Sequence, residues 1–414
     1  MSAQADTAKT ADEGIASDVA VPLVMSRWLQ VEQVDATVAT LYLQSTGKRL
    51  RVPRPLYDLL RRFQAPATLR EVAGADADIA RMVGAIRTLR AKGFLLAEGE
   101  AEAPPTRRLL TDPPIRLFDC PAQTLVPALA NVVAIGVPCD TGDRASAGAR
   151  AGPAALREAS MQTLYGIDRA TGQSQGWFDV DRGRAILRGV SVCDGGDVFV
   201  DHGERQAAVF DRLSEALEIL TAAGALPVLL GGDASICWPA LRLLQSRAPL
   251  AVVRIGVLGR RDAVETAPSA FVGAHALPRS ALGLPGVSRY VHVGPCAAGA
   301  GASLAGFAHV PVEAAARDGA AALAPHLLPG QRIYLGVDMA ALATPASDAD
   351  GVALFDYARL HALVCGIGAA HPIAGLDLVG LNPSAPCWRT TAMTALHLLL
   401  TALSAAKDPH APQA

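Results

Sequence analysis

Short, largely apolar runs, separated by Gly-rich turns and amphipathic stretches, recur through residues 126–407. Runs without polar alternation are typical of strands that a sheet buries on both faces. Between two of them, residues 205–222 place leucines and valines at helical spacing, as a helix packed on such a sheet would. Strands that alternate with helices predict an α/β fold with a doubly wound parallel sheet. The predicted strands are 132–138, 190–198, 225–230, 251–255, 290–294, 332–338 and 373–379.

A different pattern occupies residues 23–97. The stretches 38–43 and 50–52 flank the turn residues 45–48 and predict a β-hairpin. Three helical stretches follow, and 94–96 reads as a returning strand, so the order of elements predicts a winged-helix arrangement. The helical stretches are 56–63, stopped by Pro66; 69–72, capped by Thr68; and 79–89, ended by Gly93.

This part of the chain resembles the PqqD-like peptide-recognition domains. The resemblance implies that the hairpin at residues 38–52 binds the leader segment of a ribosomally made precursor peptide, which adds as a strand to the hairpin edge. Between Lys48 and Lys92, eleven basic residues stand against four acidic ones, an excess that suits an acidic leader or DNA. Peptide recognition is the favoured interpretation; a winged helix that binds DNA, or that only packs on the larger domain, stays open.

The remaining stretches predict a linker and two tails. Residues 98–125 are rich in Pro, Glu and Ala and read as a linker between domains at 23–97 and 126–407, while 1–22 and 408–414 read as disordered tails. The net charge of -2 gives no argument for a nucleic acid or membrane partner. Seven cysteines without a C-x-x-C motif predict reduced thiols, and with no signal peptide visible we expect a cytoplasmic protein.

The stretch 229–235, Leu-Leu-Gly-Gly-Asp-Ala-Ser, lies between a predicted buried strand and a helix, where α/β sheets present side chains at their carboxyl edge. It resembles the arginase/agmatinase (ureohydrolase) family, whose fingerprint is Gly-Gly-Asp-His-Ser. Residues 148–157, with a Gly-Pro helix start, and 190–198, ending in Asp-Gly-Gly-Asp, match the family in the same order. The resemblance implies an arginase-like three-layer sandwich, in which two manganese ions hold the hydroxide that hydrolyses a guanidinium C–N bond.

Most of the metal ligands that the resemblance implies are missing. Of six ligand positions, only Asp338 keeps a ligand residue. The carboxylate that pairs with the guanidinium is lost as well, because Gly380 stands where the family has Glu before Asn-Pro. The residues that replace metal ligands are Ala234, Gly256, Leu258, Gly259 and Ala340.

Three residues are candidates for chemistry at a rearranged site: His275, Asp338 and Asp233, although Asp233 is better explained as holding the amides of its own turn. Lone Asp338 is itself explained equally well as a carboxylate that caps a strand end. Four further residues at or just after strand ends could also contribute: Asp262, His292, Cys296 and Asp377.

We therefore hypothesise a degenerate ureohydrolase-fold protein, a pseudoenzyme that binds a precursor peptide in ribosomal peptide natural-product maturation. No cofactor is expected, and manganese would be the cofactor if the site were active. A partner modifying enzyme and a homo-oligomer are further expectations. The alternatives are a metal-dependent hydrolase of guanidino or amidino C–N bonds with a rearranged site, and a winged-helix DNA-binding regulator.

Overall fold

The computed structural model divides into two compact units, Met1–Arg108 and Leu109–Ala414. Residues 1–19 of the tail predicted at 1–22, the tail predicted at 408–414, and the candidates Gly259 and Asp262 lie outside the described residues. The structure describes residues 20–26, 28–43, 45–46, 48–73, 79–101, 109–142, 146–163, 166–167, 174–179, 183–201, 203–258, 272–296, 304–342 and 355–407.

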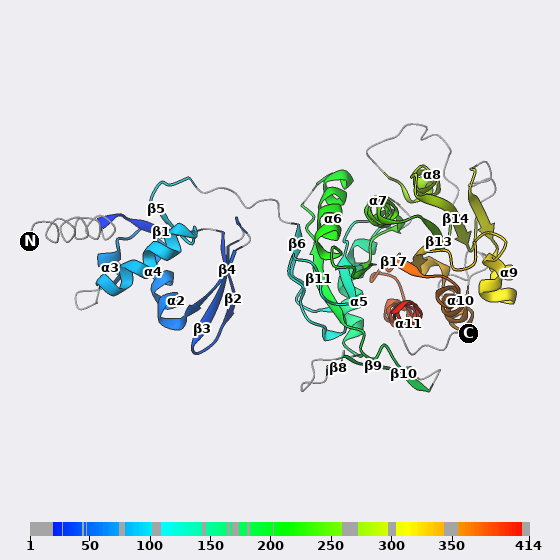
Figure 1. Cartoon of the computed structure of the whole chain (residues 1–414), viewed down its shortest axis with the longest axis horizontal. Helices are drawn as coiled ribbons and strands as arrows, with labels where there is room; N and C mark the ends of the chain where they lie inside the picture. Colours follow the sequence, from blue (N-terminus) through cyan, green and yellow to red (C-terminus); the bar gives the residue numbers. More distant parts are fainter. Residues whose placement is uncertain are drawn as a thin grey trace, which may run out of the picture. The chain divides into compact units, whose positions relative to one another are not determined.

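The N-terminal unit contains the predicted hairpin and three helices, together with two strands that the sequence did not predict (Figure 1). A three-stranded antiparallel sheet has the order β2-β3-β4, and the returning strand β5 pairs with β1 instead of with the hairpin. The elements are β1 (Leu23–Met25), β2 (Leu29–Val34), β3 (Val38–Leu43), β4 (Lys48–Pro53), α2 (Arg54–Leu60), α3 (Leu69–Ala73), α4 (Ile79–Ala91) and β5 (Leu95–Ala97).

Period-two burial explains why this sheet forms. Alternate residues of β3 turn inward, so Ala39, Leu41 and Leu43 are buried in a cluster with helix residues such as Phe63. The predicted cap at Thr68 is present as a reciprocal pair: the Thr68 amide donates to the Glu71 carboxylate at 2.8 Å, and the Glu71 amide donates to Thr68 Oγ1 at 3.3 Å.

The second unit is built on a nine-stranded sheet of order β15-β14-β13-β16-β17-β12-β7-β11-β6, in which every neighbouring pair is parallel except β11 and β6. The predicted α/β fold with a parallel sheet is therefore confirmed. Its strands are β6 (Leu110–Thr111), β7 (Val132–Gly136), β11 (Val192–Val198), β12 (Leu226–Leu230), β13 (Leu250–Ile255), β14 (Val287–Val293), β15 (Phe307–Val310), β16 (Ile333–Asp338) and β17 (Ile373–Val379).

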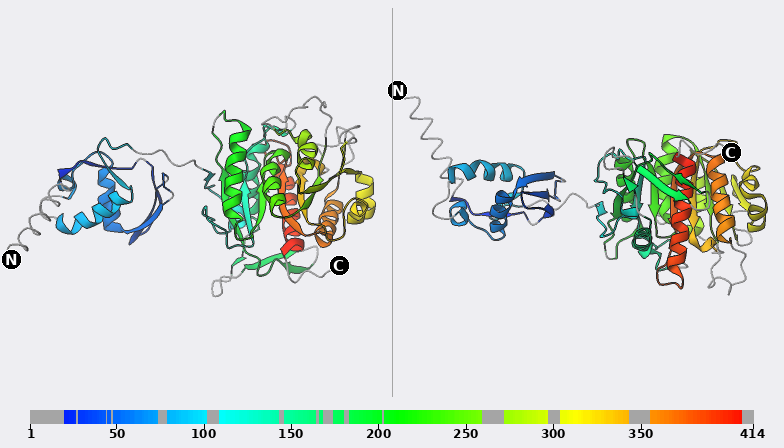
Figure 2. Two further views of the ribbon diagram at one scale, coloured as in Figure 1. Left: turned by 45° about the horizontal axis from the view of Figure 1, so that its top comes forward. Right: turned by 90° about the horizontal axis from the view of Figure 1, so that it is seen from below.

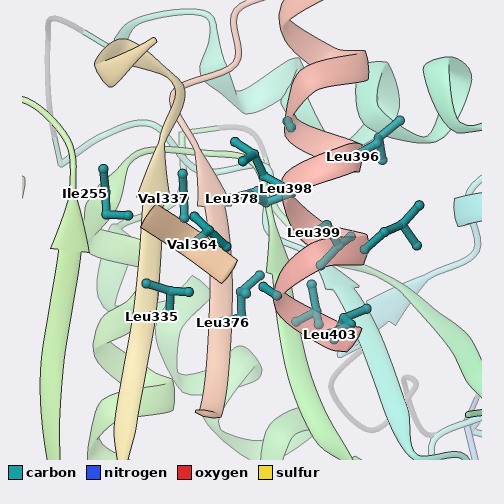
Figure 3. Close-up of a cluster of buried hydrophobic side chains, with 14 of the residues drawn as sticks. Ile255, Leu335, Val337, Val364, Leu376, Leu378, Leu396, Leu398, Leu399 and Leu403 are labelled. Carbon is teal, nitrogen blue, oxygen red and sulfur yellow. The ribbon is translucent and has the colours of Figure 1, made fainter. Parts of the chain in front are cut away.

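Helices cover both faces of this sheet and make three layers (Figure 2). One face packs on α5, α9, α10 and α11, and the other packs on α6, α7 and α8. Figure 3 shows part of the first layer, where leucines of α11, among them Leu398 and Leu399, share a buried cluster with Leu376 and Leu378 of β17. The helices are α5 (Gly152–Ser160), α6 (Gln206–Leu220), α7 (Cys237–Arg247), α8 (Leu277–Leu282), α9 (Val312–Asp318), α10 (Tyr357–Ala370) and α11 (Trp388–Lys407).

Part of the predicted linker at 98–125 is structured instead. Strand β6 pairs with the end of β11, and the side chain of Phe118 is fully buried against Trp177. The amides of Leu117 and Phe118 donate to buried side chains at 2.9 and 2.8 Å, so tertiary contacts order a stretch whose composition suggests a linker. The sequence also did not predict β15 or the separate three-stranded sheet of β8 (Gly166–Ile167), β9 (Ser174–Asp179) and β10 (Arg184–Ile186).

Two simpler expectations can be compared with the structure. All seven cysteines are described and none forms a disulfide. Among the described helices, none combines the length and the apolar character that crossing a membrane requires.

Candidate functional site at the carboxyl edge of the sheet

Four neighbouring strands, β13, β16, β17 and β12, bring the predicted site positions together. They run parallel, so their carboxyl ends lie at one edge of the sheet. Gly256 follows β13, Asp338 ends β16, Gly380 follows β17 and Ala234 lies in the turn after β12. The edge that the sequence singled out is therefore a single region in space.

The Gly-Gly-Asp turn after β12 has a structural explanation. Gly231 and Gly232 have φ angles of 76° and 69°, and a Cβ on them would lie 2.1 Å from Pro153 and 2.3 Å from the Cys139 carbonyl. Only glycine fits both the conformation and the close approach of helix α5. The Gly380 amide donates to the Gly232 carbonyl at 3.0 Å, which joins this turn to the end of β17.

Asp233 holds the loops around it. Its buried carboxylate accepts hydrogen bonds from the amide of Gly142 at 2.6 Å and from the amide of Ser235 at 2.8 Å. The neighbouring Ala234 is buried in the apolar cluster on the α6–α7 face. This geometry agrees with the interpretation of Asp233 as a residue that fixes loop amides, and it gives position 234 an apolar environment.

Asp338 lies between two glycines. A Cβ on Gly256 would be 3.0 Å from Asp338 Cβ, and a Cβ on Gly380 would be 2.1 Å from Asp338 Oδ1. The same Oδ1 accepts a hydrogen bond from the amide of Ala340 at 2.9 Å and so caps the 3-10 turn Met339–Ala341. The carboxylate thus lies in space that a side chain at position 380 would need, and the Cβ of Asp338 lies close to position 256.

The other predicted positions are arranged differently. Leu258 is buried, and its amide donates to the Pro295 carbonyl at 2.9 Å, next to a bridge with Cys296. Ala340 is exposed. His275 lies half-buried in the 3-10 turn Ala274–Ala276, directly before α8.

His292, which the sequence singled out at a strand end, is a buried neutral side chain. Its Nε2 lies 3.0 Å from the Pro295 carbonyl oxygen, and its buried Nδ1 has no hydrogen-bond partner among the described residues. Burial lowers the pKa of His292 to about 4. The ring stacks on that of His309, with 6.0 Å between centroids.

Two ion pairs involve buried charged residues on strands of the nine-stranded sheet. Arg254 on β13 crosses Gly336 on β16 and donates to both oxygens of Asp377 on β17, at 3.0 and 2.7 Å. Asp377 is thereby explained as the partner of Arg254. The sequence signal was an isolated Arg within the apolar run 251–255, which requires a buried counter-charge.

The second pair links helix α5 to β11. Arg157 donates to the two oxygens of Asp194 at 2.8 and 2.9 Å and also contacts Asp197. Burial by itself would raise the pKa of Asp194, but the Arg157 guanidinium and two backbone amides outweigh it and hold this pKa below its ordinary value. The Asp-Gly-Gly-Asp stretch of β11 therefore anchors a helix.

A model of the arginase family matches residues 130–404. The chain belongs to the arginase family. Residues 1–129 lie outside this match, and the matched range covers the nine-stranded sheet apart from β6.

Several curated relatives of this arginase-family chain have named activities. Human mitochondrial guanidino acid hydrolase is 34% identical over 127 residues, 31% of this chain and 32% of that protein. Chicken mitochondrial agmatinase is 27% identical over 186 residues, 42% and 51% of the two chains. Proclavaminate amidinohydrolase of Streptomyces clavuligerus is 32% identical over 157 residues, 37% and 42%. The chain thus spans about a third to a half of the length of the curated relatives that it matches.

Solved structures share the fold. Proclavaminate amidino hydrolase from Streptomyces clavuligerus superposes with a TM-score of 0.55 at 21% identity, covering 70% of this chain and 96% of that one. A hypothetical agmatinase from Burkholderia thailandensis gives a TM-score of 0.56 at 20% identity, covering 70% and 90%. At these identities the likeness establishes an arginase-like fold and nothing further.

The described residues do not fit the two manganese ions that the arginase family implies. Such a centre needs several carboxylate and imidazole donors that converge. At this edge the family positions retain one carboxylate, Asp338, which already caps a turn. Within the described ranges, no three His, Cys, Asp or Glu side chains lie close enough together to hold a metal ion.

Proposed function

We propose that this arginase-family protein is a peptide-binding subunit and does not hydrolyse guanidines through a two-manganese centre. The observation that carries the proposal is the position of Asp338 between Gly256 and Gly380. A single carboxylate, hydrogen-bonded to the Ala340 amide, is too little negative charge to hold two dications and lower the pKa of a bridging water. The glycine at 380 also removes the carboxylate that would pair with a guanidinium.

We assign peptide binding to the N-terminal unit, interpreted as a PqqD-like winged-helix module. Strand β4 is an outer strand of its sheet. The Arg54 amide donates to the Thr37 carbonyl at the end of the β3–β4 ladder. Along an antiparallel strand every second residue turns its N–H and C=O toward the partner strand. The backbone groups of Arg49 and Arg51 therefore point away from β3, toward the open side of β4. An extended leader peptide can pair with these groups as an added strand.

The charge of this edge supports an acidic leader. Lys48, Arg49 and Arg51 are all exposed on β4. Their cationic side chains also discourage pairing between copies of the same edge. We further propose that the arginase-fold unit contacts a partner enzyme that modifies the peptide, because holding a peptide next to an enzyme raises its effective concentration.

The names of the relatives favour a second candidate, hydrolysis of a guanidino or amidino C–N bond at a rearranged site. Such a site would need, in addition to Asp338, donors from outside the described residues. The two candidates differ in metal content, which makes metal analysis the first experiment.

The full chain is purified from cells supplied with manganese and iron, and its metal content is measured. The same protein is assayed for urea release from arginine, agmatine and 4-guanidinobutyrate. We expect less than one metal ion per chain and no urea. Stoichiometric metal together with urea release would refute the proposal and establish the hydrolase.

Peptide binding is tested at the β4 edge. A phage-displayed library of random dodecapeptides is selected on the full chain, and a selected peptide is titrated against wild type, Arg51→Pro and Arg51→Ala. Proline removes an outward N–H without removing a ladder hydrogen bond, so we expect Arg51→Pro to weaken binding about tenfold. Arg51→Ala keeps the N–H and is the matched control. Equal affinity of wild type and Arg51→Pro, at an unchanged Tm, would reject this edge.

A further inference from the structure

A surface pocket of about 320 Å³ lies in the N-terminal unit beside the end of α4 and strand β5. Its lining residues are Arg87, Arg90, Ala91, Leu95 and Glu100. Arg87 and Arg90 are three residues apart on α4 and so lie on the same side of the helix. The pocket therefore combines two guanidinium groups with the edge of a strand.

Among the described strands, β5 pairs only with β1. Leu23 of β1 uses its N–H and C=O for hydrogen bonds with Ala67, on the side of β1 that faces away from β5. Leu23 and Ala97 are therefore a pair without mutual hydrogen bonds, and the N–H and C=O of each residue point away from the other. The N–H and C=O of Ala97, and two residues earlier those of Leu95, consequently point outward. Because Leu95 also lines the pocket, this edge and the pocket form one surface.

Glu100 lies against this edge. Its Oε2 accepts a hydrogen bond from the Ala97 amide at 2.8 Å, and its own amide donates to the Ala97 carbonyl at 3.0 Å. A carboxylate of the chain itself thus lies at the edge of β5 in a pocket with two arginines. Glu100 is exposed, so another carboxylate can replace it without loss of a buried contact.

We propose that this pocket binds an acidic side chain of an extended peptide that adds to the outer edge of β5 and displaces Glu100. The outward N–H and C=O of Leu95 can pair with a peptide backbone, and those of Ala97 become available when their hydrogen bonds to Glu100 open. A phosphodiester backbone cannot pair with both kinds of group. Peptide is therefore the occupant, and the two arginines select its charge. This site is separate from the β4 edge and does not rest on the proposed function.

The test uses a fluorescein-labelled peptide of alternating Glu and Val, titrated into the full chain by fluorescence anisotropy, with a Lys-Val peptide as the charge control. We expect the double variant Arg87→Ala/Arg90→Ala to weaken binding about threefold to tenfold. Glu100→Gln keeps an acceptor for the Ala97 amide but removes the competing charge, so binding should tighten severalfold. Arg317→Ala/Arg359→Ala removes two exposed arginines of the second unit, is the charge-matched control and should bind as wild type. Arg49→Ala/Arg51→Ala is titrated beside it to report binding at the β4 edge.

Wild-type affinity of Arg87→Ala/Arg90→Ala at an unchanged Tm would overturn the inference, as would unchanged binding by Glu100→Gln. Failure of the acidic peptide to bind the wild-type chain would also overturn it. Loss confined to Arg49→Ala/Arg51→Ala would assign the peptide to the β4 edge, which would reject this pocket and support the proposed function.

Discussion

The carboxylate of Asp338 lies where a side chain on Gly380 would have to begin, with Oδ1 2.1 Å from the ideal Cβ position. Asp338 ends β16, and Gly380 directly follows the neighbouring parallel strand β17. Gly380 has a φ of 78°, so its backbone as well as its surroundings favours glycine. The position that the resemblance aligns with a metal ligand and the position that it aligns with a substrate-binding glutamate form a single packed contact.

Restoring the family's glutamate should therefore destabilise the chain. We expect Gly380→Glu to lower the free energy of unfolding by about 3 kcal/mol, from backbone strain and displacement of Asp338 together. Denaturant titration measures the loss. Gly224→Glu is the control, because Gly224 has a φ of 93° with nothing within 4 Å of its Cβ position. The same loss in both variants would show that the contact with Asp338 contributes nothing.

The Arg157 ion pair should dominate the anchoring of α5. Arg157→Ala leaves the carboxylate of Asp194 buried without its cation, and we expect a loss of about 3–5 kcal/mol in the free energy of unfolding. Arg317→Ala breaks a pair with Asp318 on the surface and should leave the unfolding curve unchanged. A small effect of Arg157→Ala would mean that water or a neighbouring group compensates Asp194.

Acid should destabilise the chain partly through His292. The folded-state pKa of about 4 lies below the ordinary value of 6.5, so protons bind the unfolded chain more readily. Neutral His292 therefore contributes to the free energy of unfolding in full above pH 6.5, and this contribution is lost as the pH falls to about 4. The difference between the two limits is about 3 kcal/mol. The charged and titratable groups near the ring are His309 and Arg254.

The measurement compares denaturant unfolding of wild type and His292→Gln at pH 7 and pH 4.5. We expect the variant to lose less stability than wild type over this interval. His397→Gln, at an exposed position, is the control and should follow wild type. Parallel pH profiles of wild type and His292→Gln would contradict a buried neutral His292.

The layer of α11 on the sheet should be sensitive to cavities. Leu399 is fully buried, and Leu399→Ala should cost about 2–5 kcal/mol of unfolding free energy (Figure 3). Leu328 is 71% exposed, and Leu328→Ala makes the same chemical change where no cavity forms. Thermal unfolding of both variants measures the difference. A comparable Tm for the two would argue against tight packing of α11 on β17.

The strands buried on both faces were predictable from the sequence. Runs such as 251–255 and 373–379 are apolar at nearly every position, because helices cover each side of the sheet. The edge strands β6 and β15 and the three-residue β1 were missed, since short strands at a sheet edge have no such pattern. Burial of Phe118 in the predicted linker likewise depends on residues far along the chain.

The sequence by itself determined that the chain has an arginase-like α/β architecture. It also determined that four positions lack a side chain that can bind a metal, because residue identity alone decides this: Ala234, Gly256, Leu258 and Ala340. It left open what the remaining carboxylates do. Only the tertiary structure decided this: Asp233 binds loop amides, Asp377 pairs with Arg254, and Asp338 fills the space left by glycines on two flanking strands. The physical reason is that these contacts join residues distant in sequence, which become neighbours only through the order of strands in the sheet.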